Sequence, residues 1–411
     1  MTTMTEGEAL LWRSERHPQR SATQTLLLIL DRVPDQARWY AVHERATRLL
    51  PHTRARVREP AVPVGPPQWA TDPHFDLAYH LRRVRLPAPG RMPELLKFAQ
   101  QAAMAPFDRN RPLWEATLVE GLPDGKAAYL LKVHRSLADA AVVLRLLSPG
   151  PPPQPRPNRR SAAQLLTAGT TALAHPQAAA VNALHLVASM RRAAAPLTAS
   201  GSPLFGGRTG SSWRYRVLEC RLTDLETAAR AVGGCVGDAY VAALLGGMRR
   251  YHEIHGVDLD AIPTSMPVGG HRTVATFAAP LAKADPQERI AAVHGITLSL
   301  GVEPALEVLP SVLPVLNRLP SAVVAATGRI LATADLYASY LPGSPHRTRL
   351  AGALVERIYL FGPLPGSAVT AAMVAHAGVC CVAVTIDGTA VADPDKLISC
   401  LHEGFEEVLA R

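Results

Sequence analysis

Cysteine is scarce in this chain, and its spacing predicts neither a metal centre nor a disulfide framework. Five cysteines occur among 411 residues, with no C-x-x-C pair and no histidine at a spacing that would complete a zinc site. Residues 1–20 contain charged and polar side chains where a secretory signal needs an apolar core. The chain also lacks a Walker-type phosphate loop and a Gly-x-Ser-x-Gly elbow. We therefore predict a protein of the reducing cytoplasm, without a metal ion.

Aromatic residues are also few, at 5% of the chain, and almost all of the basic residues are arginine rather than lysine. The formal net charge of +9 would suit a polyanion, but no basic block is interleaved with aromatic side chains. The chain has few aromatic side chains on which nucleic-acid bases could stack, so we expect no nucleic-acid partner. The arginine surplus instead favours a small substrate that bears phosphate groups, because guanidinium binds phosphate oxygens in bidentate fashion.

Length and apolar content predict two domains. A chain of 411 residues, of which 48% are hydrophobic, is too long to fold around a single hydrophobic core of ordinary size. A run rich in proline starts at residue 148, and its backbone favours an extended linker. We predict an N-terminal domain at residues 1–147, a linker at 148–160 and a C-terminal domain at 161–411.

The stretch that follows the linker raises the question of membrane contact. Residues 161–190 contain no formally charged side chain and are rich in alanine and leucine. Polar side chains and Pro176 interrupt the apolar character, so we predict packed helices rather than a span. Contact of these helices with a lipid surface stays open as the alternative, in which the protein is peripheral to the membrane.

Helix and strand patterns alternate along the chain and predict a mixed α/β fold. Residues 114–120 and 126–134 form a predicted hairpin, because the five residues between them have turn chemistry. The other expected strands are 24–31, 213–222, 354–361, 369–375 and 379–386, and the expected helices are 39–50, 92–105, 237–255 and 394–409.

A segment that contains a histidine lies at the end of the second hairpin strand. It is Lys132-Val133-His134-Arg135-Ser136-Leu137-Ala138-Asp139-Ala140, a short distance after Pro112-Leu113-Trp114-Glu115. This layout resembles the wax ester synthase/diacylglycerol acyltransferase family, whose signature is His-His-x-x-x-Asp-Gly after a Pro-Leu-Trp-Glu element. Further segments similar to that family follow in its order over nearly the whole chain: Gly237-Asp238, Pro267-Val268-Gly269-Gly270-His271-Arg272, Ser339-Tyr340-Leu341-Pro342-Gly343-Ser344 and Asp387-Gly388.

The resemblance implies both a fold and an activity. The implied fold is α/β, with two lobes like chloramphenicol acetyltransferase and a tunnel between them that suits an apolar acyl chain. The implied reaction moves an acyl group from a thioester donor, which is coenzyme A or a carrier protein, to an alcohol or amine acceptor. Coenzyme A thioester is then a co-substrate, and no permanently bound cofactor is expected. Donor and acceptor are both small molecules, and oligomeric state is left undetermined.

This segment differs from the family signature at the position of the general base. The family's second histidine is the general base, and its position is held by Arg135, whose guanidinium stays protonated and cannot accept a proton. His134 is the remaining candidate base, although strand alternation would point it to the other side. Alternatively, His134 is a structural residue that packs at a domain interface. Arg135 is a candidate for holding an oxyanion or a phosphate.

The other departures fall on functional motifs while the packing motifs persist. Asp139 matches the family aspartate and is expected to hold the loop, whereas Ala140 replaces a glycine that permits close backbone approach. Gly237, before the retained Asp238, and Tyr340 both stand where the family has asparagine. Ser136 is expected to be structural, because two residues so close on an extended chain rarely pair as nucleophile and base.

Three hypotheses follow from this pattern. The first is an acyltransferase in which His134, or the substrate itself, supplies the missing base. The second is a homologue without activity that binds a lipid, an acyl ligand or a partner in the same tunnel. The third is a pocket that acts on a different biosynthetic intermediate, because fold alone does not determine function.

Overall fold

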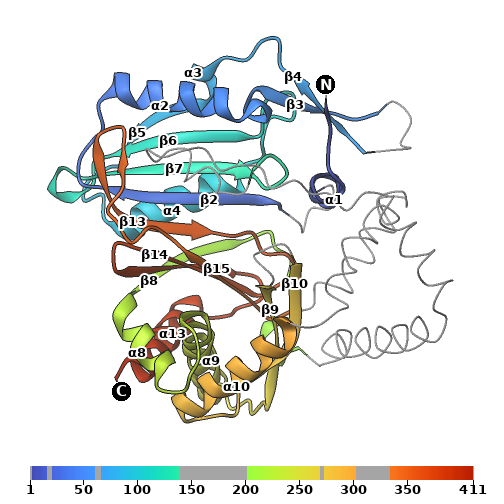
Figure 1. Cartoon of the computed structure of the whole chain (residues 1–411), viewed down its shortest axis with the longest axis vertical. Coiled ribbons are helices and arrows are strands. Elements are labelled where there is room, and N and C mark those ends of the chain that lie inside the picture. Colours follow the sequence, from blue (N-terminus) through green and yellow to red (C-terminus); the bar gives the residue numbers. More distant parts are fainter. Residues whose placement is uncertain are drawn as a thin grey trace, which may run out of the picture.

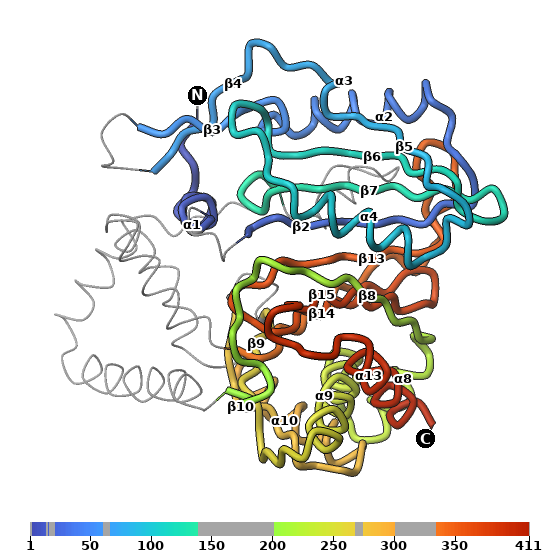
Figure 2. Tube along the Cα trace, turned by 180° about the vertical axis from the view of Figure 1, so that it is seen from behind, coloured from blue at the N-terminus to red at the C-terminus, as the bar shows by residue number. Residues whose placement is uncertain are grey.

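The computed structural model describes residues 2–15, 21–60, 66–138, 201–268, 273–301 and 334–410. Within these ranges the strands form two six-stranded sheets and a small three-stranded sheet (Figures 1 and 2). The first sheet has the order β12 (Arg349–Leu350), β13 (Ala353–Phe361), β2 (Thr23–Leu30), β7 (Ala127–His134), β6 (Trp114–Glu120) and β5 (Leu81–Arg85). The second has the order β10 (Thr273–Pro280), β9 (Ala261–Val268), β11 (Leu336–Pro342), β14 (Val369–His376), β15 (Val379–Asp387) and β8 (Trp213–Arg221). The small sheet has the order β1 (Thr2–Thr3), β4 (Gln68–Thr71) and β3 (Ala55–Arg58).

Eight α-helices lie in the described ranges. They are α1 (Glu6–Ser14), α2 (Gln36–Leu49), α3 (Leu77–His80), α4 (Met92–Met104), α8 (Leu222–Arg230), α9 (Val236–Ile254), α10 (Pro286–Gly301) and α13 (Pro394–Leu409). Short 3-10 turns are η1 (Pro51–Arg54), η2 (Pro123–Gly125) and η4 (Pro203–Phe205). Among these helices none combines the length and the apolar character that crossing a bilayer requires. The predicted helices at 161–190 lie outside the described residues.

Helices α2 and α4 cover opposite faces of the first sheet. Every residue of β2 is buried, and its successive side chains point to opposite faces. Leu28 therefore joins the cluster that contains Trp39 of α2, whereas Leu27 joins the cluster that contains Leu95 of α4. The strand and the two helices predicted here from apolar spacing are confirmed within a few residues at each end.

The predicted hairpin is also confirmed. Strands β6 and β7 are antiparallel, with Trp114 opposite Val133. The turn between them needs left-handed backbone, which Gly121 and Gly125 supply with φ of 87° and 68°. This hairpin places His134 at the last position of β7, where the strand leaves the sheet.

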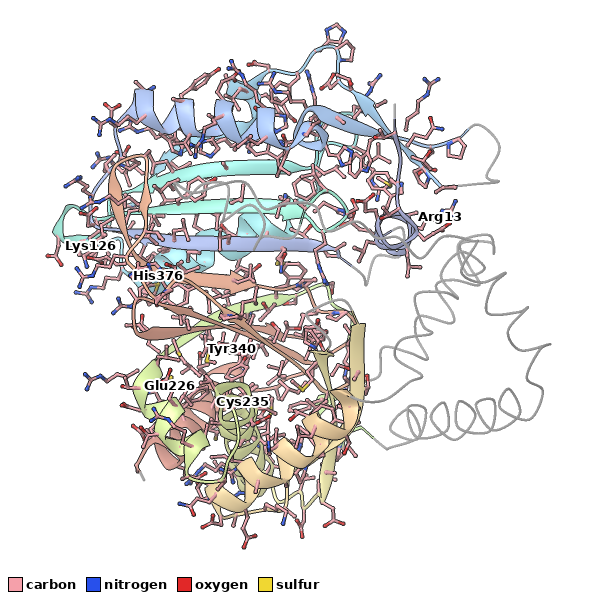
Figure 3. The ribbon with its side chains drawn as sticks, in the orientation of Figure 1. Arg13, Lys126, Glu226, Cys235, Tyr340 and His376 are labelled. Carbon is pink, nitrogen blue, oxygen red and sulfur yellow. The ribbon has the colours of Figure 1, made fainter. Side chains whose placement is uncertain are left out.

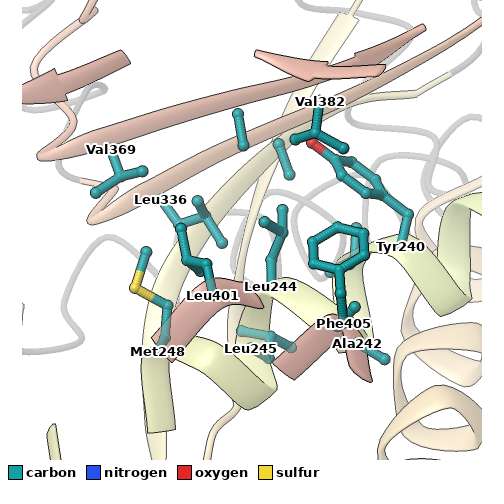
Figure 4. Packing of buried hydrophobic residues seen from close by; sticks show 14 of the residues in the cluster. Tyr240, Ala242, Leu244, Leu245, Met248, Leu336, Val369, Val382, Leu401 and Phe405 are labelled. Carbon is teal, nitrogen blue, oxygen red and sulfur yellow. The ribbon is translucent and has the colours of Figure 1, made fainter. Parts of the chain in front are cut away.

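The second sheet packs its outer face on α9 and α13, which lie side by side beneath the strands (Figure 4). Apolar side chains of both helices, among them Leu244, Met248 and Leu401, fill the space under the sheet. Gly247 of α9 and Gly404 of α13 lie at the crossing of the two helices, where the backbones approach closely. The absence of a side chain at these two positions sets the distance between the helices.

Strand β13 connects the two halves of the chain. It comes after the predicted linker, yet it pairs antiparallel with β2 and covers what would otherwise be an open sheet edge. A cluster between the sheets contains side chains from both, including Tyr215 and Phe361, whose rings stack with centroids 4.0 Å apart. The predicted boundaries around 148–160 lie outside the described residues and remain a proposal. Residues 349–361 complete the sheet of the N-terminal part.

Candidate active site

His134 is fully buried at the end of β7. Trp12 of α1 and Phe107 lie edge-on to its imidazole, with ring centroids at 6.0 and 6.4 Å. Lys132, two residues earlier on the same face of the strand, donates to the carbonyl of Ala105 at 2.6 Å. Its ammonium also lies 4.1 Å from the centroid of the Phe107 ring, and burial lowers the pKa of Lys132. Lys132 thus holds in place the segment that packs against His134.

Both ring nitrogens of His134 have partners, which together define its tautomer. The Ser136 backbone N–H donates to Nδ1 at 3.1 Å, and the Ser136 hydroxyl oxygen lies 2.6 Å from the same nitrogen. Because a backbone N–H only donates, Nδ1 must present its lone pair. Nε2 lies 3.0 Å from Oε2 of Glu15, and a carboxylate only accepts, so Nε2 bears the proton. Nδ1 therefore accepts from the Ser136 backbone, and Nε2 donates to Glu15.

Glu15 comes directly after α1 and is held by several groups. The Ala22 N–H donates to it at 3.4 Å, and the Arg109 guanidinium lies 3.7 Å from its Oε2 and 4.5 Å above the Trp12 ring. Burial alone would raise the pKa of Glu15, but its hydrogen bond to His134, with smaller contributions from Ala22 and Arg109, lowers the pKa overall. Glu15 is an ionised partner for His134 at neutral pH.

Glu15 and Arg109 were not predicted as site residues. Glu15 is 119 positions from His134 in the sequence, and no motif spacing connects them. A glutamate near the end of a short amphipathic helix is a common surface feature, so the sequence held no signal that would single it out. Only the packing of α1 against the end of β7 brings the carboxylate to the imidazole.

Arg135 follows His134 and is half-buried. Its backbone N–H donates to the carbonyl of Ala22 at 3.0 Å, which aligns the exit of β7 with the start of β2. Across the part of the chain that the structure describes, its guanidinium makes no hydrogen bond or ion pair. Asp139 and Ala140 lie outside the described residues, so their roles remain predictions.

Gly237, Asp238 and Tyr340 form a second group in the other lobe. Asp238 is buried at the start of α9, where its carboxylate accepts from the Cys235 N–H, His294 Nδ1 and Thr297 Oγ1, each at 2.8 Å. Burial raises the pKa of Asp238, but these hydrogen bonds outweigh burial and lower it. Asp238 therefore fastens α10 to the start of α9, which is an architectural role.

The two departures at Gly237 and Tyr340 lie next to each other. A Cβ on Gly237 would lie 3.8 Å from Cδ1 of Tyr340, so the tyrosine ring supplies bulk that position 237 lacks. Figure 3 shows Tyr340 and Cys235 close together in the second lobe, and Arg13 of α1 at the edge of the first. Within the described ranges no hydrogen bond or ring contact joins this group to His134. The predicted site residues thus fall into two separate groups.

A cleft of about 370 Å³ lies at the opposite end of β7 from His134. Lys126, which Figure 3 labels, is one of its lining residues. Seven residue steps separate the ends of the strand, which is about 24 Å. Four of the charges that line the cleft are paired: Lys126 donates to Glu356 at 2.7 Å, and Arg357 donates to Glu219 at 2.7 Å. The pair of Arg357 and Glu219 joins strands of the two sheets, β13 and β8. No group of three or more His, Cys, Asp or Glu side chains that could hold a metal ion occurs among the described residues.

An apolar cavity of about 30 Å³ lies between α2 and the first sheet, lined in part by Val133 and Leu137. His43 borders it, donates from Nδ1 to the Trp39 carbonyl at 2.8 Å, and accepts at Nε2 from the Tyr129 hydroxyl at 2.8 Å. Burial lowers the pKa of His43 from 6.5 to about 4. The histidine is therefore neutral in the folded protein at all but acidic pH.

This buried histidine predicts a pH dependence of stability. Below pH 6.5 the unfolded chain binds a proton at His43 that the folded chain does not bind until about pH 4, so folding loses stability as the pH falls. The loss reaches about 3 kcal/mol at the lower limit. In urea unfolding between about pH 7 and pH 4.5, His43→Gln should lose less stability than wild type, because glutamine keeps both bonds without titrating. Parallel curves for the two proteins would contradict this.

Two family profiles match the chain and account for most of its length. The profile of the wax ester synthase/diacylglycerol acyltransferase catalytic domain matches residues 4–240, and that of the C-terminal domain matches residues 271–408. The chain belongs to the wax ester synthase/diacylglycerol acyltransferase family. A relative from Mycobacterium tuberculosis, named as a diacylglycerol O-acyltransferase, is 35% identical over 445 aligned positions that cover 98% of this chain and 90% of that protein.

This member of the wax ester synthase/diacylglycerol acyltransferase family shares its fold with two kinds of solved structure. The wax ester synthase/diacylglycerol acyltransferase of Marinobacter aquaeolei VT8 superposes with a TM-score of 0.68 at 20% identity, covering 99% of this chain and 98% of that one. A mutant starter condensation domain of rhizomide synthetase in complex with C8-CoA superposes with a TM-score of 0.60 at 11% identity, covering 100% and 95%. These likenesses confirm the expected α/β fold. The tunnel remains a prediction.

Proposed function

We propose that this protein transfers an acyl group from a thioester, such as an acyl-CoA, to an alcohol or amine, with His134 as the base. The observation that supports this is the imidazole held between Glu15 and Ser136. A base for acyl transfer must accept a hydroxyl proton near neutral pH, and imidazole is suited to that task. The carboxylate of Glu15 lies where it would stabilise the imidazolium that forms.

Arg135 has a different part in this proposal. It occupies the family's base position, but a guanidinium cannot accept a proton. Because its guanidinium has no partner within the described ranges, it is available to a substrate. We assign it to the oxyanion of the tetrahedral intermediate or to an anionic part of the donor, both of which an arginine stabilises.

The proposed donor is a coenzyme A thioester, with an acyl carrier protein as the alternative. Family membership and the C8-CoA complex of the condensation domain support coenzyme A. We place the reaction in the cytoplasm, with contact to a membrane surface through residues 161–190 as an extension of the proposal.

The test is thiol release from a panel of acyl-CoA donors with pooled alcohols and amines as acceptors. Wild type should release thiol, and His134→Ala should lower the rate by about 100-fold or more, the contribution of a general base. His402→Ala, on the exposed face of α13, is the matched control and should leave the rate unchanged. If wild type is silent and Arg135→His is active, the natural protein is a binding homologue and the proposal is wrong. Turnover that does not depend on His134 would also contradict it.

A further inference from the structure

Three arginine side chains, here called the arginine cluster, converge on one backbone carbonyl at the tip of the hairpin of β12 and β13. Arg32 donates from Nη2 to the carbonyl oxygen of Gly352 at 3.0 Å, and Arg349 donates from Nη1 to the same oxygen at 3.1 Å. Nη1 of Arg38 lies 3.1 Å from the point that a Cβ on Gly352 would occupy. The three guanidinium groups therefore surround a single residue that has no side chain.

The backbone of the turn allows this convergence. A two-residue turn, Ala351 and Gly352, joins β12 to β13, and its φ angles are 50° and 90°. Glycine adopts such an angle without strain, and the missing Cβ also leaves room for the guanidinium of Arg38. The hairpin thus holds its own arginine, Arg349, against two arginines that belong to the N-terminal part of the chain.

Little negative charge lies near the cluster to balance it. One carboxylate oxygen of Asp31 lies 3.8 Å from Nη1 of Arg32, and the other accepts from a backbone N–H of β13 at 2.7 Å. The carboxylate of Asp35 caps α2 by accepting from the backbone N–H of Arg38 at 2.9 Å. Within the ranges that the structure describes, the guanidinium groups of Arg38 and Arg349 form no ion pair. The cluster therefore keeps a net positive charge.

We propose that the arginine cluster binds the phosphate group of a small molecule. A guanidinium has five N–H donors, and the bond to Gly352 uses one donor of Arg32 and one of Arg349, so donors remain for the oxygens of a ligand. Guanidinium matches phosphate in planar, bidentate geometry. A phosphate dianion also has enough oxygens to reach three guanidinium groups, whereas a carboxylate has two oxygens and a single charge. The shared carbonyl holds two of the groups in advance, which reduces the ordering that binding requires.

The proposed phosphate site is remote from His134. His134 lies opposite the first residue of β2, whereas Arg32 lies beyond the last one, Leu30. The length of the strand, about 24 Å, separates the two places, so the phosphate takes no part in acyl transfer. It instead connects the β12–β13 hairpin, which pairs with β2 from the C-terminal part of the chain, to β2 and α2. Bound phosphate should therefore stabilise the folded chain.

The experiment titrates the full chain with inorganic phosphate by calorimetry, in parallel with sodium chloride of the same ionic strength. Wild type should bind phosphate saturably at a single site, and its melting temperature should rise with phosphate but not with chloride. Arg38→Gln and Arg349→Gln should each weaken binding by about tenfold or more, because each removes a charged donor to the ligand. Arg230→Gln, which removes an equal charge from an exposed side chain of α8, is the control and should leave the affinity unchanged.

Arg349→Lys keeps the test valid if glutamine disturbs the hairpin. Lysine retains the charge but not the bidentate geometry, so phosphate binding should weaken while the melting temperature without phosphate stays near that of wild type. Equal weakening by Arg230→Gln and Arg349→Gln would show a diffuse effect of net charge and overturn the proposal, as would the absence of saturable binding to wild type. Binding to vesicles of phosphatidylglycerol and phosphatidylcholine without binding to inorganic phosphate would assign the cluster to a lipid surface and overturn it as well.

Discussion

Gly247→Ala should destabilise the protein severely, by at least about 3 kcal/mol, because it forces two helix backbones apart. A Cβ at this position would lie 2.4 Å from Cα of Leu401 and 2.7 Å from the carbonyl oxygen of Cys400. These are backbone atoms, so no rotamer change removes the overlap. Gly404 on the facing helix has the same problem, since its Cβ would lie 2.3 Å from the nitrogen of Gly247. We expect either insoluble protein or a melting temperature lowered by at least roughly 4 °C.

The control is Gly295→Ala on α10. No atom of the described residues outside that helix's own neighbouring backbone lies within 4 Å of a Cβ built there. Replacing glycine by alanine inside a helix at such a site should be neutral or stabilise by up to about 1 kcal/mol. Thermal melting of the three proteins side by side distinguishes a steric effect at the crossing from a general effect of the substitution. Equal melting temperatures would show that α9 and α13 can separate without cost.

The elements that the sequence predicted well are those determined by local patterns. The helix at 394–409 is found as α13 with the same ends, and the Asp393 side chain caps it by accepting from the Lys396 N–H at 2.9 Å. The hairpin follows from its turn glycines, and the strands 369–375 and 379–386 follow from their apolar runs. Each of these depends on a few neighbouring residues, which is the information that a single sequence holds.

The features that the sequence did not predict depend on contacts between distant segments. The pairing of β13 with β2 joins residues more than 300 positions apart, and nothing in residues 353–361 indicates which sheet they enter. The connection from Glu15 to His134 is of the same kind. Ser136 was visible beside His134, but its contact with Nδ1 depends on the direction of the chain after β7, which periodicity does not describe.

Glu15→Gln should lower turnover by about 100-fold while leaving the fold intact, because it removes a charge and little else. The glutamine oxygen can still accept from Nε2 of His134, so the ring keeps a partner. A neutral amide, however, does not compensate the positive charge that the imidazole acquires when it takes the proton of the acceptor. The loss should therefore appear in kcat more than in KM, and the acid limb of the pH–rate profile should move to lower pH.

Glu8→Gln is the matched control for that substitution, since it neutralises another carboxylate on the same helix. Glu8 accepts from the Thr5 N–H at 2.9 Å and from Nε1 of Trp69 at 3.3 Å, and it has no contact with His134. It should keep the helix cap, because the glutamine oxygen still accepts from the Thr5 N–H, and leave turnover within about threefold. A merely structural role for Glu15 would give the two variants similar kinetics and unchanged pH profiles. Unequal kinetics at equal melting temperatures would show that Glu15 acts through the charge it presents to His134.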